Sequence, residues 1–156
     1  MNILLVAVGK TDMAEIRSLI EKYAARIGHY ARFEVVELPD VRRRNVSEQG
    51  QRSAESEALL KLLTAGDYVV LLDERGKELR STELAEWLSK RMLSGVKRLV
   101  FVIGGPYGFA QNLYDRSEEM LSLSRMTFSH QMVRAIFAEQ LYRAFSILNN
   151  EPYHHE

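Results

Sequence analysis

Short apolar segments alternate with amphipathic ones along this chain, and that alternation constrains the fold more than any other feature. Three apolar runs, Asn2–Val8, 68–72 and Arg98–Ile103, predict strands, and segment 33–38 predicts another that a proline ends. Segment 121–124, in which leucine and serine alternate, predicts a short fifth strand. Strands that alternate with helices are typical of an α/β domain whose mostly parallel sheet carries helices on both faces.

The spacing of apolar residues predicts the helices. Asp12 and Glu15 match a capping box at the start of the first helix, which should end at Ile27. A polar stretch, 73–77, predicts a turn after the third strand. Three later helices are expected from Ser81 to about Leu93, from about Ala110 to Arg116, and from Gln131 to Leu148.

The second helix follows a polar stretch, 41–51, that predicts an exposed loop. The helix should begin at about Ser47 or Gln51 and reach Ala65, with Gly66 as its C-cap. The residues expected to face inward are Ala54, Ala58, Leu59, Leu62 and Leu63.

Length and composition predict one globular domain over residues 1–156. The chain is 46% hydrophobic and 27% charged, and it contains no repeat or linker. The absence of cysteine rules out disulfides, thiolate zinc sites and cysteine nucleophiles. The apolar run 3–8 is far too short to span a bilayer, and no export signal is visible. We therefore expect a cytoplasmic protein that is not associated with a membrane.

The charge balance limits what the chain can bind. Lysine and arginine total 21, as do aspartate and glutamate, so the molecule exerts no strong field on a polyanion. A nucleic-acid role would depend on local basic clusters or on a preassembled partner. The basic segments 42–44, 90–91 and 97–98 could contact phosphates, although such runs more often form a solvated face.

The sheet itself predicts where a ligand would bind. Ligands of open α/β sheets lie beyond the carboxyl ends of the strands. Here these ends are the turn after Leu72, the glycine loop 104–108 and the segment after 121–124. The glycines allow backbone to approach a ligand closely, although a simple tight turn has about even odds. Neither G-x-G-x-x-G nor a complete P-loop motif is present, which disfavours dinucleotide and nucleoside triphosphate sites.

The histidines give no metal signature. None of the four forms an H-x-x-x-H pair or lies at ligand spacing from carboxylates, so we expect no metal site. The tail containing Tyr153, His154 and His155 offers an aromatic ring and two titratable rings. Composition alone favours a frayed, inert terminus over a functional one.

Several segments, taken in order, resemble one family over nearly the whole chain. They are LLVAVGK at 4–10, LLDERGK at 71–77, VFVIGGPYG at 100–108, the stretch 121–147 and the ending PYHHE. In order, spacing and total length, the chain is similar to the small bacterial SPOUT methyltransferases. Members of this group methylate N3 of a pseudouridine in 23S ribosomal RNA.

The resemblance implies a SPOUT-type fold with a C-terminal trefoil knot, which pattern reasoning would not propose. It also implies a homodimer whose active sites lie at the subunit interface. S-adenosyl-L-methionine would be held largely by backbone groups of three loops, at the strand ends identified above. The implied cofactor-binding residues are Leu72, Gly104, Leu123, Ser124, Arg125, Met126, Thr127 and Phe128.

The implied substrate is 23S rRNA within the assembled ribosome, which would supply the recognition surface that a neutral chain lacks. The N3 proton of pseudouridine must leave before methyl transfer, so a base or polarising hydrogen bonds are needed. Tyr153 and His154 match the family's terminal Tyr-His, and His154 is the first candidate for an acid–base or positional role. Arg134 could bind a phosphate, orient a base carbonyl or make an interhelix contact at the dimer, and Asp73 could accept a hydrogen bond or act as base.

Two other functions stay open at this point. One is a non-catalytic, ribosome-associated factor that retains the cofactor pocket. The other is an α/β module for a different nucleotide, which the missing phosphate motifs disfavour.

Overall fold

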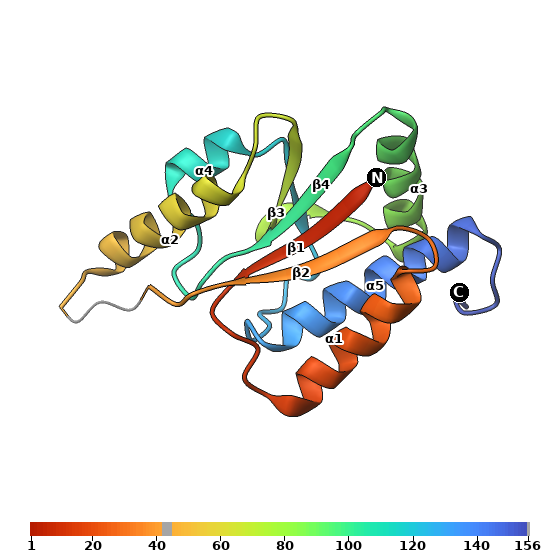
Figure 1. Cartoon of the computed structure of the whole chain (residues 1–156), viewed down its shortest axis with the longest axis horizontal. Helices are drawn as coiled ribbons and strands as arrows, with labels where there is room; N and C mark the ends of the chain where they lie inside the picture. Colours follow the sequence, from red (N-terminus) through yellow and green to blue (C-terminus); the bar gives the residue numbers. More distant parts are fainter. Residues whose placement is uncertain (42–44, 156) are drawn as a thin grey trace.

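A computed structural model describes residues 1–41 and 45–155, and its centre is a five-stranded sheet with the order β2-β1-β4-β3-β5 (Figure 1). Every pairing between these strands is parallel, which confirms the predicted α/β class. The strands are β1 (Asn2–Val8), β2 (Arg32–Leu38), β3 (Asp67–Glu78), β4 (Arg98–Ile103) and β5 (Glu119–Ser122). The helices are α1 (Ala14–Ile27), α2 (Glu48–Leu62), α3 (Ser81–Leu93), α4 (Gln111–Arg116) and α5 (Met132–Leu148). The arginine run 42–44 lies outside the described residues.

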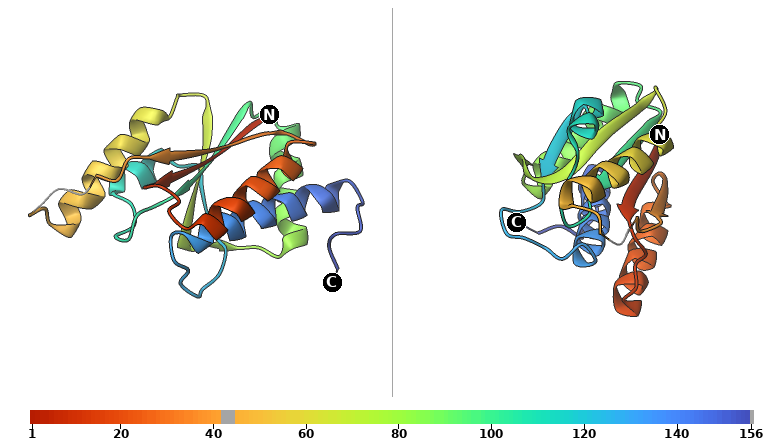
Figure 2. Two further views of the ribbon diagram at one scale, coloured as in Figure 1. Left: turned by 60° about the horizontal axis from the view of Figure 1, so that its bottom comes forward. Right: turned by 90° about the vertical axis from the view of Figure 1, so that its left-hand side faces the viewer.

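Helices cover both faces of the sheet (Figures 1 and 2). Successive residues of a strand point to opposite faces, so β1 contributes to two separate cores. Ile3 and Leu5 pack with residues of α3 and α5, whereas Leu4 and Val6 pack with residues of α2 and α4. Both sets are buried, which explains why β1 is apolar throughout. No helix among the described residues is long and apolar enough to cross a membrane.

The predicted turn at 73–77 is wrong, because β3 continues to Glu78. Its first half pairs with β5 up to Leu121, and after a bulge Lys77 pairs with Leu121 again. A Cβ on Gly76 would lie 2.7 Å from backbone atoms of Leu121 and Met120, so only glycine lets the bulge close against β5. The bulge places residues 73–75 at the carboxyl end of the sheet.

Two predicted boundaries near the first helix and the fifth strand are also wrong. The capping box at Asp12 does not form, because the Asp12 N–H donates to Gln131 Oε1 at 3.1 Å and α1 begins after Met13. The fifth strand ends at Ser122, whose hydroxyl donates to the Ser124 carbonyl at 2.9 Å and turns the chain. Both shifts come from partners that sequence spacing does not reveal.

The second helix begins as predicted and ends early. The Ser47 hydroxyl accepts the Gly50 N–H at 3.0 Å, which confirms Ser47 as the N-cap. The helix stops at Leu62, so Gly66 is not its C-cap. The Asp67 carboxylate accepts the N–H and hydroxyl of Thr64 at 2.8 and 2.9 Å, which diverts the chain from the helix.

Candidate active site

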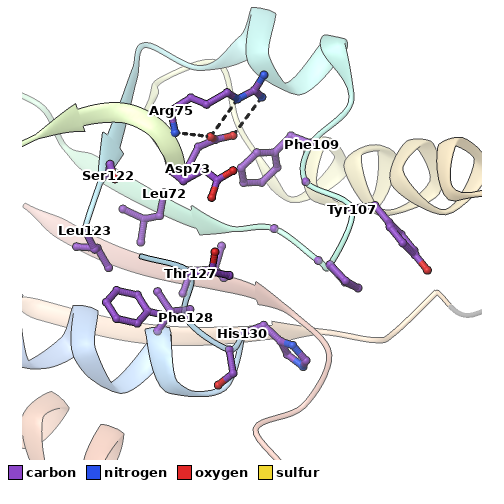
Figure 3. Close-up of a pocket in the computed structure, with 18 of the residues that line it drawn as sticks. Leu72, Asp73, Arg75, Tyr107, Phe109, Ser122, Leu123, Thr127, Phe128 and His130 are labelled. Carbon is purple, nitrogen blue, oxygen red and sulfur yellow. Dashed lines mark hydrogen bonds and ion pairs between the residues drawn. The ribbon is translucent and has the colours of Figure 1, made fainter. Parts of the chain in front are cut away.

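A cavity of about 910 Å³ lies at the carboxyl ends of β3, β4 and β5 (Figure 3). Most of its lining comes from three segments that follow the strand ends expected from the sheet rule, and Glu48, Arg52 and Tyr114 of α2 and α4 complete it. The structure brings seven of the eight implied cofactor residues together there: Leu72, Gly104, Leu123, Ser124, Met126, Thr127 and Phe128. Arg125 does not line the cavity, because its highly exposed side chain pairs with Glu78 at 3.3 Å.

The glycine loop turns back on itself at the cavity. The Gly108 N–H donates to the Gly105 carbonyl at 3.1 Å, and Gly108 has a φ of 75°, which few other residues adopt. A Cβ on Gly104 would lie 3.0 Å from the buried Phe109 ring. The wall therefore carries no side chain at Gly104 and Gly105, whereas Pro106, Tyr107 and Phe109 of the same loop also line the cavity.

The segment after β5 is fixed by local hydrogen bonds. The Met126 N–H donates to the Ser124 hydroxyl at 2.9 Å, and the Met132 N–H donates to Ser129 Oγ at 3.1 Å. These bonds shape the loop between β5 and α5. Leu72, Leu123 and Phe128 provide apolar surface beside it (Figure 3).

The β3 bulge adds a charged cluster to the cavity. The Asp73 carboxylate accepts hydrogen bonds from the Arg75 N–H at 2.9 Å and the Tyr114 hydroxyl at 2.5 Å, and it pairs with the Arg75 guanidinium at 3.3 Å. Burial raises the pKa of Asp73, but the bonds from Tyr114 and Arg75 outweigh it, so the pKa lies below its usual value. Asp73 thus stays ionised near neutral pH and is a poor general base.

Arg134 is wholly buried and serves the protein's own backbone. Its guanidinium donates to the carbonyls of Val8, Gly9 and His130, each at 2.9 Å, and to the Thr11 hydroxyl at 3.0 Å. Burial lowers the pKa of Arg134. Its side chain ties the loop after β1 to the start of α5, and it lines no cavity described here.

The C-terminal tail packs on α5 instead of fraying. The Tyr153 hydroxyl donates to Glu139 at 3.0 Å, and the Tyr153 ring lies 4.6 Å from that of Tyr142. The Arg143 guanidinium lies over the Tyr153 ring and 3.3 Å from His154 Nδ1. No described tail residue lines the cavity, which lies at the other end of α5. One chain therefore brings the predicted cofactor residues together without Tyr153 and His154.

The exposed basic pairs lie away from the cavity. Arg91 pairs with Glu119, and Arg98 lies 3.5 Å from Asp67. Arg98 begins β4, so this pair is at the amino edge of the parallel sheet, opposite the cavity. The described residues contain no group of three histidine, aspartate or glutamate side chains placed to hold a metal ion.

Sequence reasoning missed two buried polar residues beside the glycine loop, Glu55 and Ser56. Both lie on the inner side of α2, where apolar residues were expected, and of that expected set only Leu59 is fully buried. The Ser56 hydroxyl accepts the Ala110 N–H at 2.9 Å. The one available signal was spacing, since Glu55 is one helical turn from both Gln51 and Leu59.

The chain matches the family described as "Predicted SPOUT methyltransferase" over residues 1–154. It belongs to the SPOUT methyltransferase family. It is 53% identical over 156 residues to "Ribosomal RNA large subunit methyltransferase H" of Christiangramia forsetii, covering 99% of each chain. The protein of the same name from Parabacteroides distasonis is 52% identical over 157 residues, covering all of both chains. The parallel sheet fits the SPOUT class, and the trefoil knot stays a prediction.

Proposed function

We propose that this SPOUT protein transfers a methyl group from S-adenosyl-L-methionine to N3 of a pseudouridine in 23S rRNA. In this proposal the whole chain acts as one domain in the cytoplasm, as a homodimer, and its substrate is the assembled ribosome. The observation that carries the proposal is the backbone-lined cavity at three strand ends, where seven implied cofactor residues meet. The two relatives are named as methyltransferases of large-subunit ribosomal RNA, which supports the class of substrate.

The residues around the cavity fit this cofactor. The absence of a Cβ at Gly104 leaves peptide groups free to bind polar atoms, and Leu72, Leu123 and Phe128 can cover an adenine ring. Three carboxylates and two guanidinium groups line the cavity, those of Glu48, Asp73, Glu74, Arg52 and Arg75, which leaves one net negative charge toward a ligand that would be a cation. When bound, S-adenosyl-L-methionine supplies an electrophilic methyl group on a sulfonium. The protein mainly has to align the acceptor with it.

Activation of the acceptor would come from the tail. The Arg143 guanidinium can only donate hydrogen bonds, so His154 Nδ1, which faces it, must be the acceptor. In the neutral ring the proton is therefore on Nε2. Nε2 is buried within its own chain, so the tail must shift before this tautomer can donate to a carbonyl beside N3 and favour loss of the N3 proton. Because the tail lies away from the cavity of its own chain, we infer that His154 of the partner subunit acts at each site. Tyr153 positions that tail, and Arg134 acts indirectly by holding the loop after β1.

A substitution at Gly104 tests the cofactor assignment. Gly104→Val should weaken S-adenosyl-L-methionine binding at least about tenfold, a loss of roughly 1.4 kcal/mol, because the side chain meets Phe109 and narrows the cavity. Calorimetry measures the affinity, and circular dichroism checks the fold. Gly66→Val is the matched control, since a Cβ there meets no atom within 4 Å. Unchanged affinity in the Gly104 variant would contradict the assignment.

Methyl transfer to ribosomes tests the function directly. Labelled S-adenosyl-L-methionine is offered with ribosomes that lack the modification and, separately, with the same RNA stripped of protein. We expect label on ribosomes alone, because a chain with no net charge depends on a preassembled partner. Label on both acceptors would support the methyltransferase activity but would contradict the view that the neutral chain needs an assembled ribosome for recognition. Label on neither, with cofactor still bound, would favour the non-catalytic ribosome-associated factor.

A further inference from the structure

A second cavity, of about 700 Å³, lies beside the first at the carboxyl end of β1. The two cavities share Gly105, Pro106, Tyr107 and His130. These four residues form a rim with one cavity on each side. A polymer bound in the first cavity could therefore continue over the rim into the second.

Glu55 supports this rim from below. It is 2% exposed, and its Oε1 accepts a hydrogen bond from the Gln51 side chain at 2.8 Å. Glu55 Oε2 makes no hydrogen bond within the described part of the chain. A Cβ on Gly105 would lie 2.8 Å from Oε1 and closer still to Oε2, so the carboxyl group fills the space of a side chain at Gly105.

Burial raises the pKa of Glu55, the hydrogen bond from Gln51 lowers it and the charge of Asp40 raises it again, so that the pKa lies above its usual value. Ser56, the next residue of α2, holds the other end of the glycine loop through Ala110. Because α2 contacts both ends of the loop, the rim between the cavities is firmly placed.

Three groups in the lining of the second cavity match the parts of a nucleotide, and they lie beside three carboxylates, those of Asp12, Asp40 and Glu55. Tyr107, which is 43% exposed, offers an aromatic face for stacking, and Lys10 offers an exposed cation for a phosphate. Gln51 offers a side-chain amide for a base edge. Gln131 accepts the Asp12 N–H and donates to the Lys10 carbonyl at 3.0 Å, which fixes the loop that carries Lys10. The volume is within the range of small-ligand sites.

We propose that the second cavity binds the RNA nucleotide next to the methylated one, with its base on Tyr107 and its phosphate on Lys10. This inference rests on the proposed function, since it assumes that the acceptor nucleotide enters the first cavity. It adds a second contact that selects the site by its neighbour.

Filling the cavity from α2 tests the proposal. Gln51→Trp should raise the dissociation constant and the KM for unmodified ribosomes about tenfold, while the affinity for S-adenosyl-L-methionine stays within twofold. Glu57→Trp, on the exposed side of the same helix, is the matched control and should change neither. Ribosome binding is measured by filter retention, so the result does not depend on turnover. Wild-type ribosome affinity in Gln51→Trp, or an equal loss of cofactor affinity, would overturn the proposal.

A second variant, Lys10→Glu, tests the proposal without placing a tryptophan on α2. The Lys10 side chain is exposed, so the substitution should leave the fold unaffected. The variant should weaken ribosome binding. It should also reduce the magnitude of the slope of log affinity against log salt concentration by about 1, the change expected when one phosphate contact is lost. An unchanged slope would rule out the phosphate at Lys10. If the wild-type protein binds ribosomes but transfers no methyl group, the proposed function is wrong. The binding comparisons would still show whether the second cavity contacts the RNA.

Discussion

Removal of residues 153–156 should lower methyl transfer to ribosomes by about 100-fold or more and leave cofactor affinity unchanged. The size follows from losing a group that polarises the acceptor or moves its proton. Cofactor binding should survive because no described tail residue lines the cavity. Single-turnover transfer and calorimetry measure the two quantities. His155→Ala is the control, since no role is assigned to that ring. Normal activity in the truncated protein would show that the tail has no role in methyl transfer.

Mixed dimers locate the action of the tail. One subunit carries the tail deletion and the other carries Gly104→Val. If the tail serves the partner's cavity, one complete site forms, from the cavity of the first subunit and the tail of the second. At a cofactor concentration well below the dissociation constant of the Gly104 variant, mixed dimers should then regain about half of wild-type activity, whereas each parent dimer keeps the low activity of its own defect. Inactive mixed dimers would show that the tail serves its own chain.

Replacing Arg134 by methionine should destabilise the protein by about 3 kcal/mol. The change leaves the buried Val8 carbonyl, the buried Thr11 hydroxyl and two partly buried backbone carbonyls without their donor. Each fully buried loss is worth about 1–3 kcal/mol before removal of the buried charge offsets part of it. For a chain of this length, the melting temperature should fall by roughly 6–12 °C.

Urea unfolding at one fixed protein concentration measures this change, because the proposed dimerisation would make stability depend on concentration. Arg32→Met is the control, since Arg32 pairs with Glu34 at an exposed surface and should contribute less than about 1 kcal/mol. Arg134→Lys should rescue little, because an ammonium group cannot reproduce the planar set of donors. A loss below about 1 kcal/mol for methionine would contradict the role assigned to Arg134.

Local patterns predicted the features of this fold that depend on one segment at a time. The apolar run of β1 marked a strand covered on both faces, and the parallel arrangement placed a site at the ends of β3, β4 and β5. These inferences need only the period of a strand and the rule for parallel sheets. Ser47 is a similar case, because an N-cap contacts the chain only three residues away.

Features that depend on distant partners escaped prediction. The β3 bulge closes only because Gly76 meets the backbone of β5, and a polar stretch with a glycine otherwise indicates a turn. Glu55 on a helix is expected to face water, yet the glycine loop covers it. The tail packs through Tyr153 on Tyr23, 130 residues away, so its order could not be read from its composition.

The bonds of Arg134 also bear on the order in which the site is completed during synthesis. Val8 and its acceptor carbonyl are made among the first residues, and the guanidinium that fixes them lies 126 residues later. Contacts this distant in sequence form slowly and late. The hydrogen bonds from Arg134 to the loop after β1 can therefore form only when nearly the whole chain has left the ribosome. Until then, the nascent chain lacks the buried guanidinium that fixes this loop to α5.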